Sequence, residues 1–363
     1  MVRVMIANTV VAKGVLALAA LLSTAPAAFA IDWTVRDLHP AGASSSYLYG
    51  GDGGRQTGLT NQNGVYRARL WNGAATSWVD LNPPGSRSAI AYAASGNSQV
   101  GYADFDTGTR ASLWHGTAAS WQDLTPAGSN DAIAYDLSGG RQVGYAAFDG
   151  VARASLWSGT AASWVDLNPT MSTNSYGLGI HGNQQVGAAL VQDISRASLW
   201  SGTKESWIDL SPSDSMFSVA NGISATQQVG YAQLGDHFHA GLWTGSAESW
   251  VNLSPAGSTD SFANAVHDGR QVGFAIFGDS WRAGIWSGTA DSWIDLSAFV
   301  PRWFSNTNAR SIWNDDQFLY IAGYGTNNTT RREEALLWTQ PIPAPSGGLM
   351  LILLSASLSR RHR

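Results

Sequence analysis

The stretch SLWSGTAASWVDLNP, at residues 155–169, decides the fold because the chain repeats it at a fixed interval. A close copy, SLWHGTAASWQDLTP, begins 43 residues earlier, and RLWNGAATSWVDLNP begins 43 residues before that copy. Self-similarity with a period of 20–50 residues indicates one supersecondary unit that recurs along the chain. The sequence therefore predicts a repeat architecture.

Three sequence marks define the repeat. The first is an aliphatic residue followed by tryptophan, at Trp71, Trp114, Trp157, Trp200, Trp243, Trp286 and Trp338. The second is Ser-Trp, at Trp78, Trp121, Trp164, Trp207, Trp250 and Trp293. The third is Gln-Val-Gly or a variant of it, ending at Gly58, Gly101, Gly144, Gly187, Gly230 and Gly273. Each step is 43 residues, except for a step of 52 before Trp338.

A single unit, residues 131–168, contains four segments with the character of strands. These are AIAYDL, RQVGYAAF, RASLWS and SWVDL, which are rich in β-branched and aromatic residues and are separated by turn residues. Four antiparallel strands in about 43 residues are typical of a β-propeller blade.

The two ends of the repeat region predict how the propeller closes. After Trp338 the chain reads TQPIPAP, which offers no fourth strand, whereas DWTVRDLHP at residues 32–40 is similar to the fourth-strand phrase SWVDLNP. We therefore expect an all-β, seven-bladed β-propeller over residues 31–340, with the N-terminal strand completing the last blade. Such closure would leave no unpaired strand edge.

The repeats resemble those of the bacterial HAF family of extracellular proteins. That family carries a pattern like A-x-x-I-N-x-x-G-Q-V-V-G, followed by a His-Ala-Phe-Leu-Trp mark. Here the copies read AIAYDLSGGRQVG and RASLW, and the last reads SIWNDDQFLYIAG; Arg replaces the family's His in most copies, as at Arg110. The resemblance implies the propeller fold and an extracellular location, and it implies no activity.

Composition limits the classes of protein and partner. Hydrophobic residues make up 44% of the 363 residues and charged residues 13%, with 40 Gly, 17 Trp and no Cys. This mixture is typical of an all-β chain with many tight turns, and it excludes disulfides and zinc–thiolate sites. Residues 31–340 hold 16 basic and 26 acidic residues, a net charge of −10, which disfavours a nucleic-acid partner.

Both ends of the chain read as targeting segments. Residues 1–30 combine two basic residues, the apolar run GVLALAALL and a small-x-small site at Ala28 and Ala30, and this layout predicts a cleaved signal peptide. Export machinery is thus an expected partner. Residues 341–363 combine a Pro-rich motif, a short apolar run and a basic end.

The C-terminal layout resembles the PEP-CTERM class of sorting tails. The motif here consists of Pro343, Ala344, Pro345 and Ser346, with Ala344 at the position of the family's Glu. The resemblance implies processing by an exosortase-like membrane enzyme. A plain membrane anchor is the alternative, and either reading implies membrane contact through the tail and location at the cell surface or outside the cell.

Arginine and aspartate recur together in the repeat. An arginine stands four residues before the third-strand tryptophan in five blades, and the same blades carry an aspartate in the fourth strand. The predicted pairs are Arg67–Asp80, Arg110–Asp123, Arg153–Asp166, Arg196–Asp209 and Arg282–Asp295. In one blade His239 and Asn252 replace both residues together. We therefore predict a structural cross-strand ion pair rather than a ring of catalytic carboxylates.

The sequence offers little chemistry beyond the repeat. No G-x-S-x-G, H-E-x-x-H or phosphate-binding loop occurs, and His237 with His239 makes only a weak metal signal. We therefore expect no catalytic residues, no metal and no cofactor.

Tryptophans that break the repeat mark the candidate site. Trp281, Trp303 and Trp313 are the three off-pattern tryptophans, and Trp303 lies in the insertion AFVPRWF before the last blade. Trp281 and Trp303 are expected on one rim, where, with Arg302, they would offer aromatic faces and a charged hydrogen-bonding group to a sugar ring. The competing interpretation is that they cover the last blade.

The predicted function is an exported binding or display module, not an enzyme, for carbohydrate or another surface polymer. One alternative is a propeller-type polysaccharide lyase or hydrolase, which a close pair of acids at the mouth of the central channel would favour. The other is a purely structural envelope or matrix protein.

Overall fold

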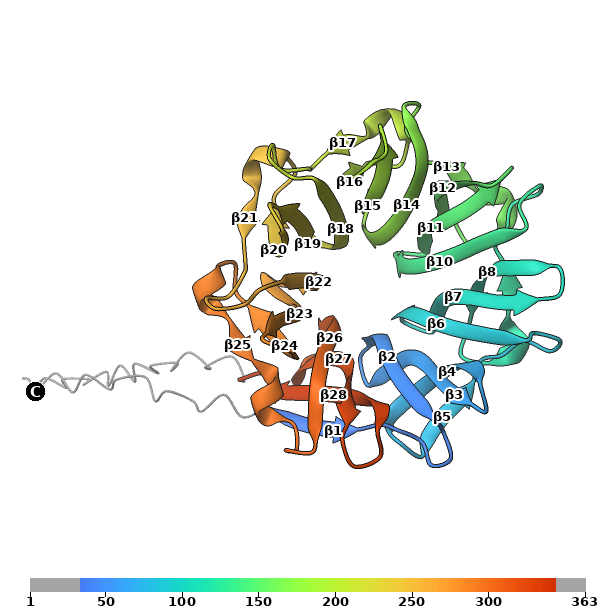
Figure 1. Ribbon diagram of the computed structural model, residues 1–363. Coiled ribbons are helices and arrows are strands. Elements are labelled where there is room, and N and C mark those ends of the chain that lie inside the picture. Colours follow the sequence, from blue (N-terminus) through green and yellow to red (C-terminus); the bar gives the residue numbers. More distant parts are fainter. Residues whose placement is uncertain (1–32, 344–363) are drawn as a thin grey trace, which may run out of the picture. The chain divides into compact units, whose positions relative to one another are not determined.

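The computed structural model describes residues 33–343, which contain 28 β-strands, six short 3-10 helices and no α-helix (Figure 1). The all-β prediction is confirmed. The strands follow one another in antiparallel sets of four, here called units, whose first strands face a common centre (Figure 1). Two neighbouring units also join in one sheet, through a parallel pairing of β8 (Gly108–Trp114) with β10 (Asp131–Ser138) at Thr109 and Asp131.

The bounds of the strands follow the repeat. The first strands of the units are β2 (Ser45–Asp52), β6 (Ser88–Ser95), β10 (Asp131–Ser138), β14 (Ser172–His181), β18 (Phe217–Ser224), β22 (Ser261–His267) and β26 (Phe304–Asn314). The second strands are β3 (Arg55–Gln62), β7 (Ser98–Phe105), β11 (Arg141–Phe148), β15 (Gln184–Val191), β19 (Gln227–Leu234), β23 (Arg270–Phe277) and β27 (Phe318–Asn327). The third strands are β4 (Val65–Ala74), β8 (Gly108–Trp114), β12 (Val151–Trp157), β16 (Ile194–Trp200), β20 (His237–Trp243), β24 (Ser280–Trp286) and β28 (Arg332–Pro341).

The fourth strands are shorter than the sequence predicts. They are β5 (Ser77–Asp80), β9 (Gln122–Asp123), β13 (Val165–Asp166), β17 (Ile208–Asp209), β21 (Val251–Asn252), β25 (Ile294–Asp295) and, before the first unit, β1 (Thr34–Asp37). Five of them follow the 3-10 helices η1 (Ala118–Ser120), η2 (Ala161–Ser163), η3 (Lys204–Ser206), η4 (Ala247–Ser249) and η5 (Ala290–Ser292), and η6 (Leu296–Phe299) follows β25.

The serine of the Ser-Trp mark explains these 3-10 helices. In one unit the Ser163 hydroxyl donates to the Thr160 carbonyl at 2.6 Å and accepts the Ser158 N–H at 2.8 Å. A short side chain that bonds the nearby backbone in this way stabilises a turn rather than a strand. The Ser-Trp mark therefore lies in the turn between the third and fourth strands, and the fourth strand begins after it.

The strand β1 pairs with β28, so the last unit takes its fourth strand from the start of the described chain. The register runs antiparallel from Thr34 opposite Thr339 to Asp37 opposite Leu336. Side chains of the first and last units also share one apolar cluster, which includes Leu38, Trp71 and Leu337.

Each apolar cluster of the core contains one of the third-strand tryptophans. The third-strand tryptophans, from Trp71 to Trp338, have no exposed surface. Trp157, for example, packs in a cluster with Leu113 of the preceding unit and Ala132 of its own. Large buried aromatics dominate core energetics, and replacing one by alanine costs about 3–5 kcal/mol.

The glycine of the Gln-Val-Gly mark permits close approach of the first two strands. At Gly144 a Cβ atom would collide with the carbonyl oxygen of Ile133 on the neighbouring strand. The backbones meet where the first strand carries a β-bulge, between Ala134 and Asp136. An equivalent irregularity occurs in the first strand of every unit, and it leaves one residue out of the ladder.

Candidate functional site

Three of the predicted arginine–aspartate pairs come together in the structure. Arg153 donates to Asp166 at 2.9 Å, Arg196 to Asp209 at 3.2 Å and Arg282 to Asp295 at 3.3 Å. Each pair links the third and fourth strands of one unit.

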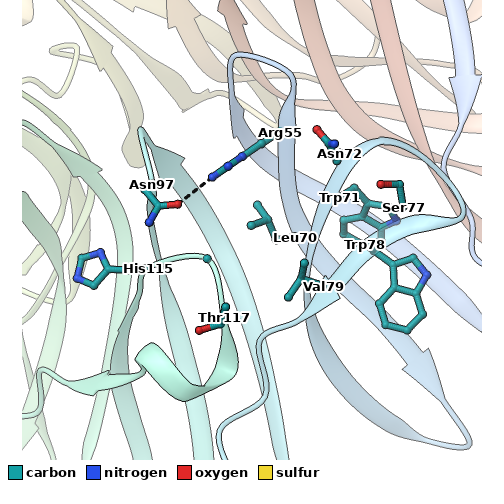
Figure 2. A pocket seen from close by; sticks show the side chains of 11 residues that line it. Arg55, Leu70, Trp71, Asn72, Ser77, Trp78, Val79, Asn97, His115 and Thr117 are labelled. Atoms are coloured by element: carbon teal, nitrogen blue, oxygen red, sulfur yellow. Dashed lines mark hydrogen bonds between the residues drawn. The ribbon is translucent and has the colours of Figure 1, made fainter.

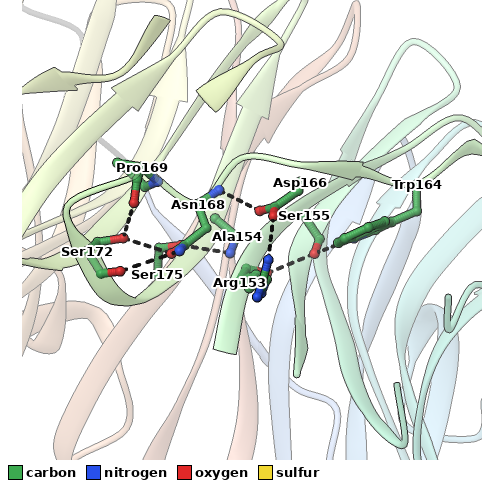
Figure 3. A network of polar contacts seen from close by, with 9 residues as sticks. All are labelled: Arg153, Ala154, Ser155, Trp164, Asp166, Asn168, Pro169, Ser172 and Ser175. Atoms are coloured by element: carbon green, nitrogen blue, oxygen red, sulfur yellow. Dashed lines mark hydrogen bonds and ion pairs between the residues drawn. The ribbon is translucent and has the colours of Figure 1, made fainter. Parts of the chain in front are cut away.

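Figure 3 shows what the first of these pairs connects. One oxygen of Asp166 accepts from Arg153, and the other accepts the Asn168 N–H at 2.8 Å. The Asn168 side chain in turn accepts from the hydroxyls of Ser172 and Ser175, on the first strand of the next unit. Because both carboxylate oxygens hold structural partners, Asp166 stabilises the joint between units.

Two of the predicted pairs are wrong. Asp80 pairs with Arg69 at 2.8 Å instead of Arg67, because the strand register puts Arg69 directly opposite Asp80. The Arg69 guanidinium also lies 4.0 Å from the centre of the Trp78 ring.

Arg110 does not pair with Asp123. Its guanidinium instead donates to the Thr107 hydroxyl at 3.1 Å in the preceding hairpin turn. Asp123 accepts the Thr125 N–H at 2.8 Å, as the equivalent aspartates of other units do with their own turns.

The substituted pair still makes contact. The Asn252 amide lies 3.4 Å from His239 Nδ1, and the Ser254 hydroxyl lies 2.8 Å from the same nitrogen. The joint change at these two positions therefore replaces an ion pair with a hydrogen-bonded group. Within residues 33–343 no cluster of three His, Cys, Asp or Glu side chains is placed to hold a metal ion.

Trp281 and Trp303 are exposed, as a surface site requires. Their side chains are 41% and 49% exposed, and Arg302 is exposed beside Trp303. The Trp281 ring stacks on Phe274, with 5.1 Å between ring centres and 26° between the planes. Its backbone N–H donates to the Asn306 side chain at 3.1 Å, which ties β24 to the segment that follows Trp303.

The third off-pattern tryptophan has a structural position. Trp313 is 6% exposed, stacks on Tyr320 and donates from Nε1 to the Gly53 carbonyl at 2.9 Å. It therefore packs the last unit against the first, and it takes no part in a surface site.

A groove of about 380 Å³ lies between the first two units (Figure 2). Arg55 donates to Asn97 at 2.9 Å across it, and His115 and Trp78 lie on its sides. The residues that line it include no acid.

A larger cavity, of about 910 Å³, lies among the first strands. The bulge residue of every unit lines it: Tyr49, Tyr92, Tyr135, Leu178, Asn221, Asn264 and Arg310. These residues were not singled out from the sequence, although six of them recur every 43 residues. The alternation of apolar and polar residues along a strand does not reveal a bulge. Only the structure shows that the seven bulge residues all line this cavity.

A close pair of acids among the described residues lies away from that cavity. Asp37 on β1 faces Glu334 on β28, and burial together with the Glu334 carboxylate raises the pKa of Asp37 to about 6. Glu334 occupies the position that holds arginine in five other units. Neither acid lines the central cavity, so this pair does not meet the condition that would favour an enzyme.

Most residues of the predicted targeting segments lie outside the part of the chain that the structure describes. Ala28, Ala30, Ala344, Pro345 and Ser346 lie beyond the described residues, which end at Pro343. Within residues 33–343 no helix has the length and apolar character needed to cross a membrane.

Comparison with solved structures shows the fold. Oligogalacturonate lyase from Vibrio parahaemolyticus aligns with a TM-score of 0.54 at 8% identity, over 84% of this chain and 93% of that one. The β-propeller domain of the Trilobed protease from Pyrococcus furiosus aligns with a TM-score of 0.51 at 11% identity, over 86% and 99%. A puromycin hydrolase mutant aligns with a TM-score of 0.51 at 12% identity, over 81% and 52%.

These similarities support the β-propeller fold alone, because sequence identities of 8–12% do not indicate a shared function. The chain spans 64% of the TolB structure from Acinetobacter baumannii and about half of puromycin hydrolase. No model of a known protein family matches the chain, and no characterised protein matches its sequence.

Proposed function

We propose that this protein is an exported β-propeller that binds carbohydrate or a surface polymer, through Trp281, Trp303 and Arg302. The exposure of the two indoles carries the proposal. The third-strand tryptophans are fully buried, whereas Trp281 and Trp303 expose 41% and 49% of their surface beside the insertion. Leaving an indole in water forgoes about 1.5–3 kcal/mol of burial, so exposed pairs are typical of binding surfaces.

The chemistry of the rim suits a sugar. The C–H face of a pyranose is apolar and packs on an indole, while its hydroxyl edge needs hydrogen-bond donors such as the Arg302 guanidinium. Stacking on Phe274 holds the Trp281 ring in one orientation, which lowers the entropy lost on binding. Trp78 is also 38% exposed, but the Arg69 guanidinium lies over its ring.

The number of blades and the closure of the ring are part of the same proposal. We read the sets of four strands as seven blades in a ring, closed by β1 in the last blade. The pairing of β1 with β28 and the apolar cluster shared by the first and last units support closure. Removal of residues 1–30 on export, and processing or anchoring of the tail at residues 341–363, would place the propeller at or outside the cell surface.

A glycan-array screen of residues 31–340 tests the proposal. Retention of a saccharide is expected, and the retained saccharide should survive prolonged incubation with the protein uncleaved. Release of shortened or unsaturated products would favour the lyase or hydrolase alternative. Absence of retention on every saccharide would favour a purely structural role.

A further inference from the structure

The central cavity carries a group of polar atoms that the fold leaves unused. Its bulge residues differ in kind around the centre: three consecutive units supply tyrosine, the next supplies leucine, two supply asparagine and the last supplies Arg310. In a ring of similar units, such an uneven distribution makes one side of the cavity chemically distinct.

The tyrosines form a continuous arc that ends at the arginine. Ring centres of Tyr49 and Tyr92 are 5.3 Å apart, and those of Tyr92 and Tyr135 are 5.2 Å apart. The Arg310 guanidinium lies 5.7 Å from the centre of the Tyr49 ring. The order around this side of the cavity is therefore Arg310, Tyr49, Tyr92 and Tyr135.

The two asparagines of the cavity are engaged in joining units. Asn221 donates to the Ala263 carbonyl at 2.9 Å, and Asn264 donates to the Ala309 carbonyl at 2.7 Å. Both bonds reach the next unit, so these two side chains hold the ring of first strands together.

The acids that line the cavity are engaged in the same way. Asp136 accepts the backbone N–H groups of Leu137 and Ile180 at 2.8 and 2.9 Å. Asp52 accepts the Gly96 N–H, and Asp268 accepts from the Asn314 amide at 3.3 Å. Each of these three aspartates accepts a hydrogen bond from the neighbouring unit, so its carboxylate helps to hold two units together.

Arg310 and the three tyrosine hydroxyls have no such partners within residues 33–343. No carboxylate lies within ion-pair distance of Arg310, and no hydrogen bond engages its guanidinium. The hydroxyls of Tyr49, Tyr92 and Tyr135 likewise form no hydrogen bond to another described protein group, although the three residues line a cavity. Burial raises the pKa of Tyr49 and of Tyr135 to about 12, so both phenols keep their protons at neutral pH.

We propose that this arc is a second binding site, which takes a sugar ring bearing a carboxylate. The planar guanidinium of Arg310 matches a carboxylate with two parallel hydrogen bonds. The phenols supply neutral hydrogen bonds to hydroxyl groups, and their rings supply faces for the C–H groups of the sugar. The cavity volume lies in the range of small-molecule sites. The arc includes neither Trp281 nor Trp303, although Phe274, on which Trp281 stacks, lines another part of the cavity.

Three ligands test the two parts of this recognition: glucuronate has a sugar ring and a carboxylate, glucose has only the ring, and acetate has only the carboxylate. Titration of the full chain by calorimetry or ligand-detected NMR should give a dissociation constant for glucuronate about tenfold or more below those for glucose and acetate. Equal binding of glucose would overturn the role of the carboxylate, and equal binding of acetate would overturn the role of the sugar ring. Absence of glucuronate binding at millimolar concentration would overturn the site.

Substitutions locate the site in the cavity. Arg310→Gln should weaken glucuronate binding by about tenfold or more, because a charge-assisted pair is lost. Arg55→Gln, which removes the same charge from the groove between the first two units, should leave binding unchanged. If Arg310→Gln does not fold, Tyr92→Phe removes a single hydroxyl and should weaken glucuronate binding by a few fold without affecting acetate.

The rim variant distinguishes this proposal from the first. Trp281→Ala combined with Trp303→Ala should leave glucuronate affinity unchanged. Loss of affinity in the rim variant, with full affinity retained in Arg310→Gln, would show that acidic sugars bind at the rim and would overturn the cavity site.

Discussion

Asp37 faces Glu334 in the last unit, at the positions where Asp166 and Arg153 form an ion pair in another unit. In both cases the aspartate lies opposite the residue two positions beyond its partner in the antiparallel register. The Glu334 carboxylate accepts from Asn327 at 2.7 Å and Thr330 at 2.8 Å, which are both neutral donors. The repeat thus replaces an attractive pair by two acids at the one joint where β1 meets β28.

This pair predicts a stability that falls as pH rises. The pKa of Asp37 is raised to about 6, above its ordinary value of 3.8, by burial and by Glu334. The folded chain therefore binds more protons than the unfolded chain between about pH 4 and 6, and the free energy of unfolding decreases through this window. Melting temperatures measured at pH 4.5 and 7 should show the decrease.

The variant Glu334→Gln isolates that contribution. Glutamine keeps a side chain of the same size but removes the charge beside Asp37, so the decrease in melting temperature between the two pH values should be smaller. Comparison with wild type is needed because Asp136, whose pKa burial also raises to about 6, adds a dependence of the same sign. Burial lowers the pKa of His39, which adds the opposite dependence. An unchanged pH profile in Glu334→Gln would contradict the assignment.

The ion pair of Arg153 and Asp166 predicts a measurable coupling energy. A double-mutant cycle with alanine at both positions should give about 0.3–1 kcal/mol, because the two side chains are partly exposed. The same cycle on Arg110 and Asp123, which make no contact, should give additive effects. Coupling in both cycles, or in neither, would contradict the observed difference between the two units.

The pairing of β1 with β28 predicts that removing β1 destabilises the protein. Deleting residues 33–38 removes Trp33 and Leu38, which are 7% and 1% exposed, and leaves β28 with an unpaired edge. Loss of about 3–6 kcal/mol of stability is expected from the two buried side chains alone. The deletion variant should melt earlier and associate through the free edge. A monomer with unchanged melting temperature would contradict ring closure by this strand.

Much of the fold was predictable because the repetition of residues reveals which of them form the core. Residues that recur every 43 positions must occupy equivalent environments, so the buried tryptophans and the glycine beside the first strand could be recognised from sequence. Arg67 was misassigned because the first unit carries a second arginine, Arg69, two residues later on the same face of the strand. Asp80 pairs with the arginine directly opposite it, at a position that holds serine or glycine in the next five units.

The central cavity was missed for a different reason. A bulge inserts one residue and breaks the alternation of faces, so a pattern of period two assigns Tyr92 or Arg310 to the wrong side. The acid pair was also missed, although Glu334 stands four residues before Trp338. Comparing the last unit with the arginine position of the others would have found it.

Retention of a glycan by the rim tests the central claim most directly. Affinity electrophoresis in the saccharide retained on the array should compare wild type with Trp281→Ala combined with Trp303→Ala. Tyr66→Ala is the matched control, since Tyr66 occupies the position of Trp281 in the first unit and is 42% exposed. The account predicts that the rim variant loses retention at an unchanged melting temperature, while the control keeps it. Full retention by the rim variant would contradict the account.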